Sequence, residues 1–209
     1  MKLALFGATG KTGKYLVEQA LAEGNYVTVL VRNPSKLSVQ HPHLTVVPGD
    51  VGNVAAVEQT IAGAEAVISV LGPTSNAPAF QVSAGMQNIL AAMKKEGVRR
   101  LVVSVGAGVG DPNDEPKLFH HLMNFILNLT ARNVYEDMKR VVDLVRASNL
   151  DWTIVRVPML TDAPKTGQVQ VGYVGKGMGL RITRADMADF ILKQVRERQF
   201  VGQAPAISN

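Results

Sequence analysis

Short apolar runs alternate with helical patterns along this chain of 209 residues, and the alternation constrains the fold more than any other feature. The runs are rich in β-branched residues and mostly lack the apolar–polar alternation of half-exposed strands; they cover residues 2–6, 26–31, 44–48, 66–72, 100–105 and 152–157. Strands of this kind are buried on both faces, which is typical of a parallel sheet covered by helices on both sides. The pattern predicts an α/β fold with a doubly wound parallel sheet.

Helical periodicity fills the segments between these runs. The helices that we expect cover residues 13–24, 54–63, 80–97, two parts of 118–149, and 182–197. Gly97 follows two lysines, as at many helix ends, and Thr183 with Asp186 three residues later is typical of a helix start. Residues 163–179 are glycine-rich with β alternation, which indicates an extended excursion near a ligand site. Because no linker, repeat or low-complexity tail interrupts the chain, residues 1–209 are expected to form one domain.

Composition and charge narrow the class of protein. The chain has no cysteine, which excludes disulfides, thiolate metal sites and a cysteine nucleophile. The net charge is +5, but the basic residues are scattered and aromatic residues make up only 5%, which argues against nucleic acid and for a small anionic ligand. No leader-like segment begins the chain and no apolar stretch reaches membrane-spanning length. We therefore expect a soluble cytoplasmic protein with no membrane partner.

The histidines do not predict a metal site. His120 and His121 are adjacent, so on a helix their side chains point about 100° apart and cannot chelate one ion as an i, i+4 pair would. His41 and His43 lie in a turn-like segment. No metal is expected.

Glycines follow the first apolar run in a pattern that nucleotide-binding proteins use. Residues 7–13 read GATGKTG, with Gly7, Gly10 and Gly13 three apart between an expected strand and an expected helix. Glycine permits the tight turn and lets the backbone approach a pyrophosphate, which binds at the helix N-terminus. A glycine-rich turn without a ligand is the alternative, but the strand-to-helix context favours a dinucleotide site.

The residues after the second apolar run bear on which dinucleotide is bound. An NAD site usually has an acid there for the ribose 2′-hydroxyl, whereas this chain has Arg32 and then Lys36. Two cations at that place favour the 2′-phosphate of NADP, and Thr9, Lys11 and Thr12 would add further donors. A solvated basic turn is the alternative. The sequence predicts NADP as the cofactor, with NADPH preferred over NADH.

Two later turns carry residues that suit the same cofactor. Asp50 follows the third run and would accept a hydrogen bond from the adenine amino group. Gly72 ends the fourth run, where a cofactor crosses the carboxyl edge of such a sheet. Either residue alone is typical of an ordinary turn, but their places at successive strand ends support one another.

Together these motifs resemble the atypical short-chain dehydrogenase/reductase families. GATGKTG, VTVLVRNPSKL, GDV, ISVLG, ASNLDWTIVRVP and ITRADMADFIL fit that pattern over nearly the whole chain. Within it, the chain is most similar to the NADPH-dependent flavin reductases, also called biliverdin-IXβ reductases, and it shades into NmrA-like regulators and sugar-epimerase relatives. The resemblance implies a Rossmann fold and these cofactor-binding residues: Gly7, Thr9, Gly10, Lys11, Thr12, Gly13, Arg32, Lys36, Asp50, Val51, Leu71, Gly72, Pro73, Ser104, Val105, Gly106, Pro158, Met159 and Leu160.

The residues for proton transfer depart from the tyrosine-dependent members of those families. Those enzymes carry a serine near the end of the fifth strand; its position falls here at Gly106, two residues beyond Ser104. Tyr135 and Lys139 are four apart on an expected helix, but the family lysine falls at Met138, about 100° around the helix from Lys139. Ser104 therefore remains a candidate for proton transfer, and Tyr135 is expected to be a surface-helix residue rather than the proton donor.

An acceptor that needs no side-chain acid fits this departure. Hydride transfer to a flavin requires stacked rings at near-attack distance, and the reduced flavin can take protons from water. A ketone or aldehyde would need a donor for the developing alkoxide. The sequence favours a flavin or a bilin-like tetrapyrrole as substrate, on an apolar lining from Pro73, Phe119 and Met159. Methionine and phenylalanine at such spacing are also typical of plain core.

Two other functions remain compatible with the sequence. One is an NADP-sensing regulator of the NmrA type, although such regulators often carry an additional C-terminal domain, which we do not expect from these 209 residues. The other is a reductase or epimerase acting on a carbonyl, quinone or nucleotide sugar, in which Tyr135 or Ser104 would do acid work. A monomer would match the resemblance, and a dimer stays open.

Overall fold

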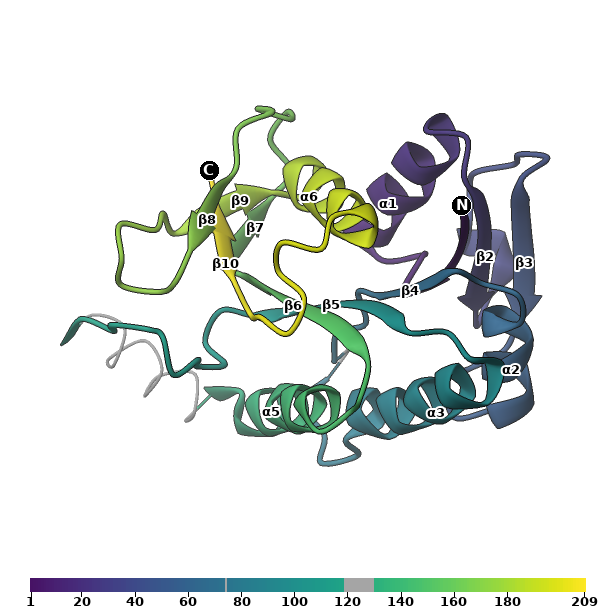
Figure 1. Cartoon of the computed structure of the whole chain (residues 1–209), viewed down its shortest axis with the longest axis horizontal. Helices are drawn as coiled ribbons and strands as arrows, with labels where there is room; N and C mark the ends of the chain where they lie inside the picture. The colour runs from purple at the N-terminus through teal and green to yellow at the C-terminus, as the bar shows by residue number, and fades with distance from the viewer. Residues whose placement is uncertain (74, 119–129) are drawn as a thin grey trace.

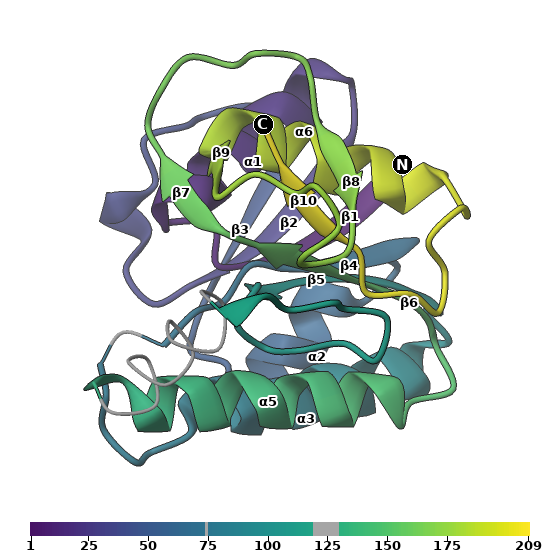
Figure 2. The same cartoon turned by 90° about the vertical axis from the view of Figure 1, so that its left-hand side faces the viewer.

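Helices cover both faces of one central sheet in the computed structural model, which describes residues 1–73, 75–118 and 130–209 (Figure 1). One face carries α1 and α6, and the opposite face carries α2, α3 and α5; the turned view shows the same layers (Figure 2). The bounds are α1 Lys11–Ala22, α2 Val54–Ile61, α3 Gln81–Glu96, α5 Arg132–Arg146 and α6 Arg184–Arg196. Within the described ranges, no helix is both long and apolar enough to cross a membrane.

The sheet is doubly wound. Its strands are β1 Lys2–Phe6, β2 Tyr26–Val31, β3 Leu44–Pro48, β4 Ala66–Ser69, β5 Arg100–Gly106, β6 Asp151–Val157, β8 Gln170–Gly172 and β10 Ala206–Ser208, in the order β3-β2-β1-β4-β5-β6-β10-β8. All neighbours pair in parallel except β10 and β8, which are antiparallel. The chain runs outward from β1 to β3 and then returns to β4, so the direction of winding reverses between β1 and β4. Ligands of such sheets bind at that point, outside the carboxyl ends of the strands.

The parallel strands divide their side chains between two hydrophobic cores, one on each face. On β1, Leu3 and Leu5 pack with α1 and α6, whereas Ala4 and Phe6 pack with α2, α3 and α5. Successive side chains of a strand point to opposite faces, so a sheet covered on both sides needs apolar residues at consecutive positions. This explains why the apolar runs lack alternation.

The structure confirms the expected fold class and differs from the sequence reading at the element ends. The strand expected over residues 66–72 stops at Ser69, because the chain leaves the sheet as a loop. The last helix begins at Arg184, after a short strand; Thr183 caps it as expected, accepting from the Asp186 N–H at 3.0 Å. Within residues 163–179, only β8 is regular. The sequence did not predict β10 or the separate parallel pair of β7 (Met159–Thr161) and β9 (Arg181–Thr183).

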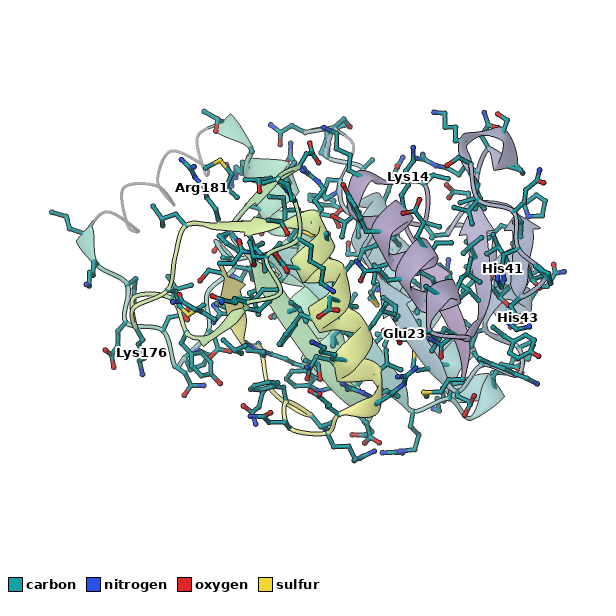
Figure 3. All side chains as sticks on the ribbon, turned by 90° about the horizontal axis from the view of Figure 1, so that it is seen from above. Lys14, Glu23, His41, His43, Lys176 and Arg181 are labelled. Atoms are coloured by element: carbon teal, nitrogen blue, oxygen red, sulfur yellow. The ribbon has the colours of Figure 1, made fainter. Side chains whose placement is uncertain are left out.

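The view from above places the ends of the molecule. In Figure 3, α1 and α6 lie side by side on the sheet, as their packing also shows. His41 and His43 lie at the β2–β3 end, whereas Lys176 and Arg181 lie at the opposite end with the short C-terminal strands (Figure 3). The connection between β2 and β3 and the segments after β6 therefore lie at opposite ends of the molecule.

Candidate functional site

The carboxyl ends of β1, β2, β3 and β4 meet at one edge of the sheet. Phe6 at the end of β1 pairs with Leu30 on β2 and with Ser69 on β4. Val31 pairs in turn with Pro48 on β3. Parallel pairing in this register makes neighbours of the turns that follow these strands, although the turns are far apart in the sequence.

A cavity of about 350 Å³ lies at this edge. More than half of the residues that the sequence assigned to a cofactor line it: Gly7, Thr9, Gly10, Arg32, Lys36, Asp50, Val51, Leu71, Gly72 and Pro73. The lining also includes Ser75, Phe80, Asn133 and Asp137, which the sequence did not assign to a site. The cavity brings the glycine loop, the basic turn and the aspartate turn into one place.

Two glycines of the first loop are required by close packing. Gly7 has φ +94°, and a Cβ there would lie 2.9 Å from the carbonyl oxygen of Val70. A Cβ on Gly13 would lie 2.0 Å from the carbonyl oxygen of Gly7, far inside van der Waals contact. Any side chain at either position would push the helix away from the strand. The glycines therefore let α1 start directly against the cavity.

The N-terminus of α1 is left without a side-chain acceptor. Its N-cap is Gly10, which has no side chain, and its first turn contains no acidic residue. The first backbone N–H groups of a helix have no partner within the helix and carry a partial positive charge. This end of α1 is therefore chemically suited to an anion such as a phosphate.

Three residues predicted to bind the cofactor, Lys11, Thr12 and Gly13, lie in this first turn but not among the described residues that line the cavity. Thr12 is buried. The Lys11 Nζ lies 3.7 Å from Asp162 Oδ2, and Asp162 also pairs with Arg184 at 2.7 Å. Lys11 therefore points toward the segment after β7, and its assignment to the cofactor stays a prediction.

Two cations and one acid surround the outer part of the cavity. Arg32 directly follows β2, and Lys36 is returned to the cavity by a short 3-10 turn, Pro34–Lys36. The Arg32 Nε lies 3.9 Å from Asp50 Oδ2, and both side chains are more than half exposed. Asp50 is oriented by its own turn, since its Oδ1 accepts from the Gly52 N–H at 2.9 Å. An exposed pair at this distance is weak, so Arg32 remains able to bind a stronger anion.

The other predicted cofactor residues form a second group, at the ends of β5 and β6. Gly106 pairs with Val157, and Pro158, Met159 and Leu160 follow directly. Ser104 and Val105 precede Gly106 on β5 and are both buried. This group lies beyond β4, on the far side of the switch point from the cavity, and none of it belongs to the cavity's described lining. Its assignment to the cofactor stays a prediction.

The substrate residues of the prediction are only partly described. Pro73 lines the cavity. Met159 is 59% exposed beside the end of β6 and presents an apolar side chain to solvent. Phe119 lies outside the described residues, as do His120 and His121.

The tyrosine–lysine pair lies on α5, and neither residue belongs to the described lining of the cavity. Tyr135 is half-buried and packs against the hydrophobic core between the sheet and its helices, whereas Lys139 is exposed. Met138, at the position of the family lysine, is buried in that core. The arrangement suits a helix residue in a packing role, and the exclusion of Tyr135 from proton transfer stays a prediction.

A buried ion pair lies beside the second group, because Arg156 pairs with Val105 in the sheet. Arg156 on β6 is 1% exposed and holds the Asp114 carboxylate with two hydrogen bonds of 2.6 and 2.7 Å. Burial raises the pKa of Asp114, but the hydrogen bonds from Arg156 and from the backbone N–H groups of Asp111 and Val174 outweigh it, so the pKa lies below its ordinary value. Asp114 is thus ionised at neutral pH and positions loops rather than donating a proton.

Sequence reasoning missed the contribution of α5 to the cavity. Asp137 is 3% exposed and accepts from the backbone N–H groups of Val82 and Ser83, in the first turn of α3. One signal pointed to it: the α3 pattern has Phe80 rather than Ser, Thr, Asp or Asn directly before it. A helix start without a local acceptor requires a distant one when it is buried.

Comparison with known proteins agrees with this geometry. The family described as NAD(P)H-binding matches residues 7–198 of the chain. The chain is 27% identical over 214 aligned positions to the oxidoreductase aflX of Aspergillus parasiticus, an alignment that covers 90% of this chain and 79% of that protein.

Solved structures share the fold at low identity. One is a short-chain dehydrogenase/reductase of Veillonella parvula in complex with NADP, with a TM-score of 0.80, 19% identity, and coverage of 100% of this chain and 94% of that one. Another is ChuY of Escherichia coli O157:H7, described as an anaerobillin reductase, with a TM-score of 0.79, 20% identity, and coverage of 100% and 97%. The chain therefore belongs to the NAD(P)H-binding family, with a Rossmann-type fold, and its relatives include oxidoreductases.

Proposed function

We propose that the protein is an NADPH-dependent reductase that transfers a hydride to a flavin or to a bilin-like tetrapyrrole. The observation that carries the proposal is an uncapped helix N-terminus beside two cations, at the switch point of a doubly wound sheet. NADP(H) suits both features. Its diphosphate accepts hydrogen bonds from backbone N–H groups, and its 2′-phosphate accepts them from positively charged side chains.

The residues present fit such a cofactor. Gly7 and Gly13 leave no room for a Cβ, so the backbone itself would form the cradle for the diphosphate at the start of α1. Asp50, Val51, Arg32 and Lys36 all line the cavity. Asp50 and Val51 would border the adenine, and Arg32 and Lys36 would bind the 2′-phosphate. When bound, NADPH supplies the hydride.

The preference for NADPH over NADH rests on the end of β2. The residues that follow this strand are Arg32 and Asn33, and no carboxylate stands there to bind a ribose 2′-hydroxyl. Asp50 is an acid near the same place, but it comes from the turn after β3 and its weak pair with Arg32 is exposed. A phosphate with nearly two negative charges would compete well for Arg32, because charge-assisted bonds to phosphate exceed an exposed pair.

The second group of residues, at the ends of β5 and β6, would hold the reacting end of the cofactor. Met159 offers an exposed apolar side chain there, which suits the face of a flat conjugated ring. Tyr135 packs in a helix layer and Ser104 is buried within β5. A flavin or bilin acceptor is favoured because positioning alone can carry hydride transfer to it. The bilin reductase among the structural neighbours is compatible with that substrate class.

The test is consumption of NADPH in the presence of candidate acceptors. The protein is mixed with NADPH and with FMN, riboflavin or biliverdin, and the loss of NADPH absorbance is followed; the series is repeated with NADH. We expect turnover that depends on an acceptor and is faster with NADPH. Tight NADPH binding without turnover on any acceptor would reject the reductase and favour the NADP-sensing regulator.

One control variant and one diagnostic variant sharpen this experiment. Lys94→Ala removes one exposed positive charge from the last turn of α3, at the opposite edge of the sheet from the cavity, and should leave turnover unchanged. Turnover on ketones or nucleotide sugars, lost in Tyr135→Phe, would instead support a carbonyl reductase or an epimerase. The monomeric state and the cytoplasmic location expected from the sequence stay predictions.

A further inference from the structure

One wall of the cavity is an irregular loop. The described part of residues 70–80, between β4 and α3, contributes Leu71, Gly72, Pro73 and Ser75 to the lining and contains no helix or strand. Such a segment gains no order from a sheet or helix ladder, and fixing its backbone costs about 1–2 kcal/mol per residue in conformational entropy. Contacts from elsewhere in the fold must therefore hold it.

Asn76 ties the middle of this loop to the start of α5. Its Oδ1 accepts from the backbone N–H groups of Asn133 at 3.0 Å and Val134 at 3.3 Å. Its own carbonyl oxygen accepts from Asn133 Nδ2 at 2.8 Å, and its Nδ2 donates to the Thr130 carbonyl at 3.3 Å. The N-cap of α5 is Ala131, whose methyl group has no acceptor. Asn76 thus caps a helix that begins more than fifty residues later.

Asp137 ties the end of the same loop to α5, but here the acceptor side chain lies on α5 and the N–H donors lie at the start of α3. From α5, its Oδ1 accepts from the Ser83 N–H at 2.9 Å and its Oδ2 from the Val82 N–H at 3.1 Å, which caps α3. The N-cap of α3 is Phe80, with φ +45°, a conformation that costs energy for a bulky residue and persists only where the surroundings hold it. Arg140 on α5 also stacks over the Phe80 ring, 3.8 Å from its centroid.

Asn76, in the loop that precedes α3, therefore caps α5, and Asp137 on α5 caps α3. The loop is held at its middle by the first cap and at its end by the second. We infer that Asn76 and Asp137 form a reciprocal clasp that holds residues 75–80 as a preformed wall and thereby sets the affinity for the dinucleotide. Asn76 does not itself line the cavity, so it acts through its neighbours, as a positioning residue. The inference rests on the proposed binding of NADP(H) in this cavity. A preformed wall binds the ligand more tightly because the loop loses no conformational entropy when the ligand binds.

The test compares three variants of the whole protein by titration with NADP⁺. Asn76→Ala removes the α5 cap and the donor to Thr130 together. Asn76→Asp keeps an acceptor oxygen for the N–H groups of Asn133 and Val134, loses the donor to Thr130, and adds one negative charge at the start of α5. Ser148→Ala is the matched control, because it removes a hydrogen bond to the Val145 carbonyl near the other end of α5 and touches no part of the loop.

We expect Asn76→Ala to bind NADP⁺ about three- to tenfold more weakly, with the KM for NADPH raised and kcat at saturating NADPH retained. Its backbone amides in residues 75–82 should exchange hydrogen faster. Asn76→Asp should restore most of the protection of the loop amides, while its added charge opposes binding of the anionic NADP⁺. Ser148→Ala should lower Tm without changing Kd.

The clasp is overturned if Asn76→Ala lowers Tm and leaves both Kd and loop exchange at wild-type values. In that case the wild type still binds NADP⁺, so the proposed function stands. If the wild type binds no NADP⁺, the proposed function falls first, and the clasp falls with it as a determinant of cofactor affinity.

Discussion

Two helix N-termini face the same cavity, and the fold treats them in opposite ways. The start of α1 has Gly10 as its N-cap and no acid in its first turn, so no side chain in the described part of the structure accepts from its N–H groups. The start of α3 also lacks a local acceptor, but Asp137 reaches across from α5 and accepts from two of its N–H groups. Both ends carry the same partial positive charge.

The comparison indicates that a helix N-terminus can bind an anionic ligand only where no side chain of the protein already accepts from its N–H groups. Because Asp137 occupies the N–H groups at the start of α3, an anionic ligand is directed to the start of α1. It also turns the carboxylate of Asp137 into a structural anion, bound where a phosphate would otherwise compete. The difference lies in one side chain rather than in the helices, and variants at either end test it.

The largest effect is expected when α1 is closed in the way that α3 is. Gly10 has φ −72°, which any residue adopts, so Gly10→Asp would place a carboxylate at the N-cap. We expect NADP⁺ affinity to fall on the order of 100-fold, because the carboxylate occupies the N–H groups and repels the diphosphate. Calorimetric titration measures the loss.

Gly10→Asn is the control for this change. Its Cβ makes the same 3.2 Å approach to the Gly7 carbonyl, and its side chain caps the helix without charge. It should lose clearly less affinity than Gly10→Asp. Equal losses would show that space rather than charge governs the α1 end.

Opening α3 should lower the stability of the fold, in addition to any loss of the dinucleotide affinity that the clasp supports. Asp137→Ala leaves the N–H groups of Val82 and Ser83 without their acceptor, and we expect the free energy of unfolding to fall by about 2 kcal/mol. Urea denaturation measures this, with Asp137→Asn as the milder variant, since it keeps one acceptor oxygen. A stability change within about 0.5 kcal/mol of zero would contradict a closed α3 end.

The cations beside the α1 end should distinguish the two dinucleotides. Arg32→Ala is expected to weaken NADPH binding about tenfold and to leave NADH binding nearly unchanged, because only NADPH carries the 2′-phosphate. Parallel titrations with both dinucleotides give the ratio. A loss shared equally by both would assign Arg32 to the diphosphate or to the general electrostatic field.

The smallest effect is expected on the α5 side of the cavity. Tyr135 lies two residues before Asp137 and packs against the core, so Tyr135→Phe should leave kcat with a flavin acceptor within about twofold of wild type. A general acid contributes roughly 10²–10⁴-fold, so steady-state rates discriminate clearly. A loss of that size would make α5 a catalytic element as well as a capping one.

Local signals in the sequence anticipated part of this site and could not have anticipated the rest. The glycine loop, Arg32, Lys36 and Asp50 follow apolar runs directly, so their convergence follows from parallel strand order alone. Thr183 and Asp186 are three residues apart, and their helix cap was predictable for the same reason. Asn76 and Asp137 act on backbone groups more than fifty residues away, and nothing near them in the sequence names the partner.

The sequence by itself determined the doubly wound sheet, the glycine-rich start of α1 and the cations after β2, because each depends on residue types within one strand–turn–helix unit. Only the tertiary structure decided which helix N-terminus is open to a ligand and which is closed. That choice depends on α5 lying beside α3, an arrangement set by packing of the core they share. The capping hydrogen bonds follow from that packing, and no local pattern in the chain identifies the residues that supply them.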